Sequence, residues 1–140
     1  MERKIVYAYV VADILHKGHL LALENAKGLG DKLIVGVLTD EAVMEKKPAP
    51  IIPFEQRLEN IKALSCVDAV VAQKDYSPVN NIKAIKPDIL MESDSHSDED
   101  LEDTYNVTDR LGIRIIKLPY YPLQSSTDIK QKVIFKYINS

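Results

Sequence analysis

Two histidines, His16 and His19, are the residues of this 140-residue chain best suited to chemistry. They stand in the sequence His-Lys-Gly-His, and side chains three residues apart can share one face of a helical turn. Gly18 between them has no side chain, so a ligand can approach the backbone closely. A structural role is the alternative for any single histidine near an apolar element. The pair around a glycine favours a functional site.

The segments on either side of the histidines predict where they lie in the fold. Residues 4–12 are rich in β-branched and aromatic side chains, which predicts a buried parallel strand. Apolar residues recur at helical spacing over 20–26, and Gly30 fits the stop of a helix that ends near Leu29. The histidines are therefore expected where a strand ends and a helix begins. In open α/β sheets this edge binds ligands, and a helix N-terminus there favours phosphate.

The rest of the chain continues this alternation of strands and helices. Strands are predicted at 32–38, 67–72, 87–91 and 113–118, and helices after Thr39 and at 54–64, 80–85, up to Gly112, and 126–138. A proline-bounded loop is expected at 46–53 and a turn at 119–122. The pattern predicts an α/β fold, Rossmann-like, with a five-stranded parallel sheet and helices on both faces.

Composition narrows the class of protein. The length suits one domain over 1–140, with 46% hydrophobic and 28% charged residues. The net charge of −3 argues against a nucleic-acid partner. We find no membrane-spanning run and no signal peptide, and the single cysteine, Cys66, excludes an intrachain disulfide and fits a small core residue. We expect a cytoplasmic protein.

The segment 13–19, Asp-Ile-Leu-His-Lys-Gly-His, resembles the H-x-G-H signature of the nucleotidyltransferase superfamily. From Lys4 to about Lys132 the chain is most similar to the small cytidylyltransferases, which activate glycerol phosphate, phosphocholine, phosphoethanolamine and related acids. The resemblance implies transfer of CMP from CTP, with Mg2+, to a small phosphate- or phosphonate-bearing acceptor, in a homodimer. It implies that His16 and His19 are catalytic and bind the α-phosphate, and that Gly18 lets the helix approach the nucleotide.

The chemistry of this transfer agrees with the residue types present. The nucleophile is an oxygen of the acceptor's own phosphate, already ionised at neutral pH, so no strong general base is needed. Charge neutralisation and alignment of the reacting groups are needed instead. Imidazoles, cations and helix N-termini around a phosphate chain supply both.

Further site residues follow from the resemblance. Ser125, Ser126 and Thr127 fall on an I-S-[ST]-[ST]-x-I motif that binds the β- and γ-phosphates, although simple helix capping also suits them. Arg57, in Glu-Gln-Arg, falls on an E-x-R motif and is expected to contact phosphate or substrate, the alternative being a solvated helix face.

Two lysines and an aspartate complete the expected catalytic centre. Family members carry a lysine in the loop after a strand ending in Thr-Asp, and Lys46 and Lys47 lie in that loop. We assign Lys46 to catalysis and Lys47 to the acceptor, although the sequence does not distinguish them. Asp13 is expected to orient a side chain or the metal, or to cap the helix entry.

The chain departs from the family's motifs around the base and the acceptor. Val10, Val11 and Ala12 replace Gly-Thr-Phe beside the nucleotide, and of a Gly-Asp-Asp-Trp motif only Asp94 remains in register. Residues 120–123, Tyr-Tyr-Pro-Leu, replace Arg-Thr-Glu-Gly, so an arginine that reads the triphosphate is lost. Related Ala-Asp-[Ile/Leu]-[Ile/Leu]-His-x-Gly-His forms occur in cytidylyltransferases of phosphonate pathways. The acceptor is therefore expected to differ, a phosphonate being one candidate, with contacts from His96, Tyr120 and Tyr121.

Other interpretations remain open. An adenylyltransferase acting on a phosphate of the flavin mononucleotide, pantetheine or nicotinamide type shares the histidines. A nucleotide-binding module without catalysis would have little use for both imidazoles. The acidic segment 94–100 lacks the glycine of a calcium loop, so we expect a solvated or lid loop there. Magnesium is expected on the triphosphate, without a dedicated protein site.

Overall fold

The computed structural model describes residues 3–93 and 96–118. Within them five parallel strands form one sheet in the order β3-β2-β1-β4-β5. The strands are β1 (Ile5–Val10), β2 (Lys32–Leu38), β3 (Ala69–Gln73), β4 (Ile89–Ser93) and β5 (Arg114–Leu118). The helices are α1 (Lys17–Lys27), α2 (Asp40–Met44), α3 (Phe54–Lys62), α4 (Val79–Ile85) and α5 (Glu102–Leu111). The predicted α/β fold is confirmed, and its strand order reverses between β1 and β4.

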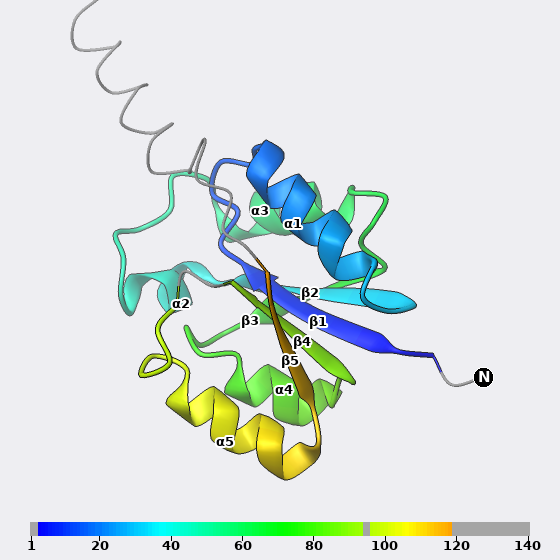
Figure 1. Cartoon of the computed structure of the whole chain (residues 1–140). Coiled ribbons are helices and arrows are strands. Elements are labelled where there is room, and N and C mark those ends of the chain that lie inside the picture. The colour runs from blue at the N-terminus through cyan, green and yellow to red at the C-terminus, as the bar shows by residue number, and fades with distance from the viewer. Residues whose placement is uncertain (1–2, 94–95, 119–140) are drawn as a thin grey trace, which may run out of the picture.

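Helices cover both faces of the sheet, α1 and α3 on one side and α4 and α5 on the other (Figure 1). Side chains alternate along β1, so Val6 packs in the layer of α1 and α3 while Tyr7 packs in the layer of α4 and α5. Burial on both faces accounts for the continuous apolar runs of the central strands. Cys66 is partly buried against the first of these layers. None of the helices in the described ranges is long and apolar enough to cross a membrane.

The ends of several elements differ from their predicted positions. β2 has the predicted bounds, whereas β3 and β4 each begin two residues later than predicted. α1 ends at Lys27, before the predicted stop at Gly30. Gly30 has a different role, because a Cβ there would come within 2.8 Å of the carbonyl oxygen of Lys4. Glycine is needed where the chain passes the start of β1. The predicted turn at 119–122 and helix at 126–138 lie outside the described residues.

A buried polar network ties the middle of the sheet to α4. The Tyr7 hydroxyl donates to Oε1 of Gln73 at 2.6 Å, and Nδ2 of Asn81 donates to the Tyr7 oxygen at 2.9 Å. Gly36 leaves room for this ring, since a Cβ there would overlap the Tyr7 hydroxyl. The Gln73 amide also donates to the carbonyl oxygen of Tyr76 at 3.2 Å. The network therefore fixes the loop that follows β3 at the carboxyl edge of the sheet.

Candidate active site

The two histidines close the first turn of α1 on themselves. His16 is the N-cap residue, with extended backbone angles, and its Nδ1 accepts the Gly18 N–H at 3.0 Å. In return, Nδ1 of His19 accepts the His16 N–H at 3.2 Å. This is the reciprocal arrangement of a capping box, made here by two imidazoles. These two contacts cap the start of the helix and orient both rings.

This arrangement determines which nitrogen of each ring can donate. A neutral imidazole carries its single proton on one nitrogen, and a nitrogen that accepts a backbone N–H must be the other one. The proton of His16 and that of His19 therefore lie on Nε2. The ring centroids are 4.1 Å apart, so the two Nε2–H donors come from neighbouring rings. Two neighbouring N–H donors of this kind suit the oxygens of one phosphate group.

The electrostatic environment keeps both rings neutral in the free protein. Burial lowers the pKa of His16. The pKa of His19 is lowered to about 4, mainly by burial and to a smaller extent by the neighbouring His16. A phosphate chain beside them would act in the opposite direction, because a nearby negative charge favours the protonated ring. As neutral rings the two histidines can therefore donate hydrogen bonds, and as protonated rings beside a bound polyphosphate they can also neutralise its charge.

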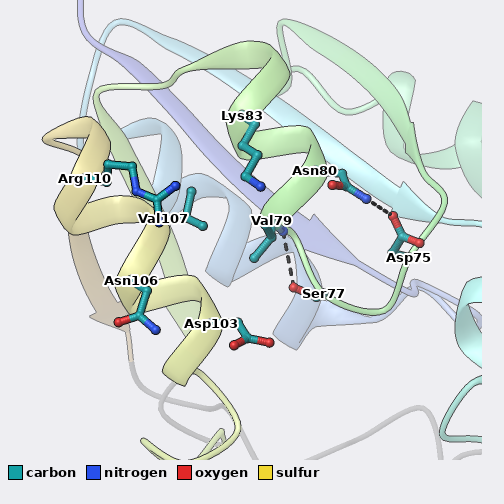
Figure 2. A pocket seen from close by; sticks show the side chains of 9 residues that line it. All are labelled: Asp75, Ser77, Val79, Asn80, Lys83, Asp103, Asn106, Val107 and Arg110. Atoms are coloured by element: carbon teal, nitrogen blue, oxygen red, sulfur yellow. Dashed lines mark hydrogen bonds between the residues drawn. The ribbon is translucent and has the colours of Figure 1, made fainter.

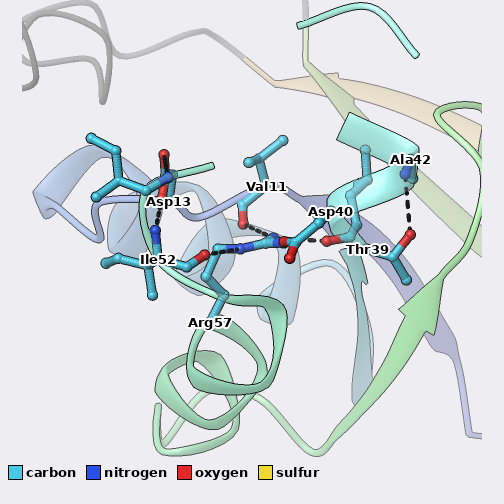
Figure 3. Close-up of polar contacts among 9 residues, drawn as sticks. Val11, Asp13, Thr39, Asp40, Ala42, Ile52 and Arg57 are labelled. Atoms are coloured by element: carbon cyan, nitrogen blue, oxygen red, sulfur yellow. Dashed lines mark hydrogen bonds and ion pairs between the residues drawn. The ribbon is translucent and has the colours of Figure 1, made fainter. Parts of the chain in front are cut away.

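Arg57 on α3 directs its guanidinium to acceptors within the protein. Its side chain is 0% exposed, with Nε donating to the carbonyl oxygen of Ile52 at 2.9 Å. Nη1 donates to the carbonyl oxygens of Val11 at 2.8 Å and Leu38 at 2.7 Å, and Nη2 pairs with Asp40 at 2.6 Å (Figure 3). Four of the five N–H donors of the guanidinium are thus used within the protein. In this structure Arg57 joins the ends of β1 and β2 to the loop 46–53, and its contact with phosphate or substrate stays a prediction.

Asp13 holds the same loop from the other side. Its side chain is 1% exposed, and its two carboxyl oxygens accept the N–H groups of Ile51 at 3.0 Å and Ile52 at 2.8 Å (Figure 3). These contacts position the backbone of the loop, and the expected roles toward a side chain, the metal or the helix entry stay predictions. Both oxygens already face backbone donors, so the site offers little to a metal ion. Asp13 and Arg57 together anchor the loop that carries the two lysines.

The backbone between β1 and Asp13 has an unusual conformation. Ala12 has φ of 55°, in the left-handed region, and its side chain is buried. A residue other than glycine seldom adopts this conformation, which costs about 1 kcal/mol or more. Val10 and Val11, also predicted beside the nucleotide, are partly buried and lead into this turn. The contacts of Arg57 and Asp13 on both sides of Ala12 hold the strained turn in place.

A second group of charged side chains gathers at the carboxyl edge from two loops. Lys46 and Lys47 are exposed after α2, with Nζ of Lys46 5.3 Å from the ring centroid of Tyr76. His96, on the loop after β4, lies close enough to both lysines that they contribute, after burial, to lowering its pKa. The structure thus brings together three residues predicted for catalysis or acceptor binding. It also gives them a neighbour that the sequence reasoning did not select, Glu92.

Glu92 is buried at the end of β4, and its Oε2 accepts a hydrogen bond from the Tyr9 hydroxyl at 2.6 Å. Burial raises the pKa of Glu92 to about 7. An acidic residue inside the apolar run Ile-Leu-Met-Glu was the available signal for it. The other predicted site residues, Asp94, Tyr120, Tyr121, Ser125, Ser126 and Thr127, lie outside the described residues.

A groove lies between α4 and α5 and reaches the loop that follows β3. Its cavity of about 500 Å³ has side chains of both charges around it, among them Asp75, Lys83, Asp103 and Arg110 (Figure 2). It contains none of the predicted site residues. The histidines and the lysines lie instead after the carboxyl ends of β1 and β2.

Comparisons with known proteins agree with this geometry. The sequence profile of the family described as cytidylyltransferase-like matches residues 9–132. Bifunctional protein HldE of Helicobacter pylori (strain Shi470) is 40% identical over 102 residues, which cover 71% of this chain and 22% of that protein. HldE of Citrifermentans bemidjiense is 32% identical over 137 residues, covering 96% of this chain and 28% of that protein. The chain thus spans about a quarter of the length of these relatives.

Solved structures show the same architecture. The lipopolysaccharide core biosynthesis protein of Thermoplasma volcanium is 29% identical with a TM-score of 0.71, over 86% of this chain and 98% of that one. Pantoate-beta-alanine ligase of Francisella tularensis, 14% identical with a TM-score of 0.60 over 99% of this chain and 72% of that one, shares the fold alone. The resemblance drawn from the H-x-G-H motif is confirmed. The chain belongs to the cytidylyltransferase-like family of nucleotidyltransferases.

Proposed function

We propose that this nucleotidyltransferase moves CMP from CTP to a phosphate or phosphonate oxygen of a small acceptor and releases pyrophosphate. The observation that carries the proposal is the pair of Nε2–H donors of His16 and His19, fixed by the backbone at the first turn of α1. Donors held in this way stabilise charge that develops in the transition state without reorganising. The match to the cytidylyltransferase-like family supports nucleotidyl transfer, and the choice of CTP over ATP is part of the proposal.

The residues divide the work of the reaction. An ionised oxygen of the acceptor attacks the α-phosphorus, and the bond from that phosphorus to the bridging oxygen of pyrophosphate breaks. The imidazoles donate to the α-phosphate and to the bridging oxygen as negative charge gathers on the leaving group. Lys46, Lys47 and His96 bind the acceptor's phosphate on the other side of the edge. Arg57 and Asp13 act through the loop that presents the lysines.

Magnesium bound to the triphosphate's own oxygens would supply further neutralisation of the phosphate chain. We assign none of the described side chains to it, because Asp13 already accepts two backbone N–H groups. We propose that Ser125, Ser126 and Thr127 bind the β- and γ-phosphates, and that Gly18 and Asp94 lie beside the nucleotide, as the family motifs imply. Tyr120 and Tyr121 remain proposed acceptor contacts.

A second candidate differs in the acceptor and the base. The Thermoplasma relative is described by its place in lipopolysaccharide core synthesis, which favours including sugar phosphates among the acceptors. Adenylyl transfer from ATP stays the alternative to cytidylyl transfer. We propose a cytoplasmic homodimer with one catalytic domain per chain, as the resemblance implies. HldE is longer than this chain, so fusion of such a domain to a further domain is compatible with the proposal.

Pyrophosphate release in the presence of magnesium tests the proposal. CTP and ATP are each offered with glycerol phosphate, phosphocholine, phosphoethanolamine, 2-aminoethylphosphonate, hydroxyethylphosphonate, flavin mononucleotide and a set of sugar phosphates. Release with CTP and one acceptor is the expected result. Release with ATP alone would replace CTP by ATP. A chain that binds CTP in calorimetry but releases no pyrophosphate with any acceptor would be a nucleotide-binding module.

A further inference from the structure

The carboxyl group of Glu92 has no part in the transfer described above, yet it is buried at the edge where ligands bind. Its side chain is 2% exposed, and Oε2 accepts the Tyr9 hydroxyl at 2.6 Å. The pairing of β1 with β4, Val6 with Ile89, places Tyr9 directly across from Glu92 when continued by three residues. A buried carboxyl group is costly to maintain, so its position calls for an explanation.

His96 faces the other oxygen of this carboxyl group, Oε1, which also accepts the Ser93 N–H at 3.3 Å. Its Nε2 lies 3.9 Å from Oε1 of Glu92, beyond hydrogen-bond distance but within the range of an ion pair when the ring is protonated. The imidazole is 27% exposed, in contrast to Glu92, so it reaches the surface at which a ligand arrives. His96 therefore stands between the buried carboxyl group and the ligand side of the edge.

The charges around these two groups have opposite effects. Lys47 and Lys46, from the loop after α2, lower the pKa of His96 after burial has done so, while Asp100 raises it. Burial raises the pKa of Glu92 to about 7, although hydrogen bonds from the Tyr9 hydroxyl and the Ser93 N–H, and the charge of Lys117 on β5, act to lower it. Without a bound anion, a proton shared by these two groups therefore lies on Glu92 rather than on His96. An anion beside the two lysines would remove their effect and favour the protonated imidazole.

We propose that Glu92, held by Tyr9, is a positioning residue that keeps His96 as an imidazolium when the phosphate group of the acceptor binds beside Lys46 and Lys47. As the phosphate arrives, the proton held by Glu92 passes to Nε2 of His96, and no other bond changes. The resulting carboxylate pairs with the imidazolium, which binds the phosphate. The site therefore selects acceptors whose phosphate or phosphonate is doubly ionised. The inference rests on the proposed function for the meaning of "acceptor", but it concerns phosphate binding and can be tested without turnover.

The chain contains only three histidines, so each imidazole can be followed by NMR. The His96 signal is assigned with His96→Asn, and the probe is inorganic phosphate titrated at several pH values. In the wild-type protein, phosphate should raise the pKa of His96 by about one to two units. In Glu92→Gln, which keeps an oxygen for the Tyr9 hydroxyl, the rise should be less than half of this, and phosphate should bind about tenfold more weakly, as expected from loss of about 1.4 kcal/mol.

Tyr7→Phe is the matched control. Tyr7 lies on the same strand and face as Tyr9, and its hydroxyl also donates a 2.6 Å hydrogen bond to a buried oxygen, that of Gln73. This variant should lose stability but keep the wild-type response of His96 to phosphate. A response in Glu92→Gln equal to that of the wild type would overturn the inference, as would a wild-type His96 that phosphate leaves unchanged.

Failure of the inference can be separated from failure of the proposed function. If no acceptor supports pyrophosphate release, the titration of His96 with phosphate still decides the role of Glu92. Where an acceptor is turned over, Glu92→Gln should raise KM for the acceptor and leave KM for CTP and kcat at saturating acceptor unchanged. If KM for the acceptor is unchanged in Glu92→Gln, the role of Glu92 is refuted, whereas the proposed nucleotidyl transfer is not.

Discussion

Replacing Arg57 by lysine separates the positioning role of this residue from the phosphate contact that its motif implies. Lysine keeps the positive charge but has one ammonium group in place of the planar fork. It cannot reach the carbonyl oxygens of Val11, Leu38 and Ile52 together, as Arg57 does. At least two of these buried acceptors should lose their donor, at about 1 to 2 kcal/mol each. Asp40 is 39% exposed, so loss of its ion pair adds little.

We therefore expect Arg57→Lys to lower the free energy of unfolding by about 2 to 4 kcal/mol. Urea unfolding followed by far-ultraviolet circular dichroism measures this as a shift of the midpoint at a nearly constant slope. Arg110→Lys is the control, because Arg110 is exposed on α5, and it should change stability by less than about 0.5 kcal/mol. Where the Arg57 variant remains folded, its free energy of CTP binding should change by less than its free energy of unfolding.

The opposite pattern would refute this reasoning. If Arg57→Lys unfolds like the wild type and like Arg110→Lys, yet binds CTP or phosphate at least about tenfold more weakly, the guanidinium acts on the ligand. Arg57 would then have to leave its buried position when nucleotide binds, and the motif-based role would be restored.

Three further predictions concern Gly36, Asp13 and Glu92. Gly36→Ala should destabilise the fold by about 1 to 3 kcal/mol in urea unfolding, because its Cβ overlaps the Tyr7 hydroxyl. Asp13→Ala should expose the loop 46–53 to limited proteolysis and cost about 1 to 3 kcal/mol, because two backbone N–H groups lose their acceptor. The pKa of Glu92 is about 7 in the folded state against an ordinary value of 4.5, so the unfolded chain releases this proton first and stability falls as pH rises between these values. The pKa of His19 is lowered to about 4, so His19 makes stability rise with pH below pH 6.5. The difference in unfolding free energy between the wild type and Glu92→Gln, measured by urea unfolding at several pH values, removes this effect and isolates Glu92. If that difference does not change with pH, the pKa of the Glu92 carboxyl group is not perturbed.

The sequence predicts the elements of this fold well, because their signals are local. The run Lys-Leu-Ile-Val-Gly-Val-Leu has the bounds of β2, since every residue from Leu33 to Leu38 is buried or nearly so. The histidine corner is likewise local, because the capping contacts of His16 and His19 span three residues. Patterns of this length contain most of the information that positions the two imidazoles.

The roles of Arg57 and Glu92 depend instead on contacts between distant segments. The acceptors of Arg57 are carbonyl oxygens that any residue carries, so nothing in the sequence marks them. Glu92 meets Tyr9 only because β4 lies beside β1, which follows from the strand order. A motif gives the residue type at a position, whereas the direction in which a long side chain points depends on this packing.

Turnover of the histidine variants tests the central claim most directly, namely that two fixed Nε2–H donors stabilise the transferring phosphate. Pyrophosphate release is measured for the wild type, His16→Asn and His19→Ala under the same conditions, with Tm and CTP affinity as controls. Asparagine is a favourable N-cap, so His16→Asn should retain the start of α1. We predict that turnover falls at least about a hundredfold in each variant while the fold and CTP binding persist. Wild-type turnover in either variant would contradict the mechanism.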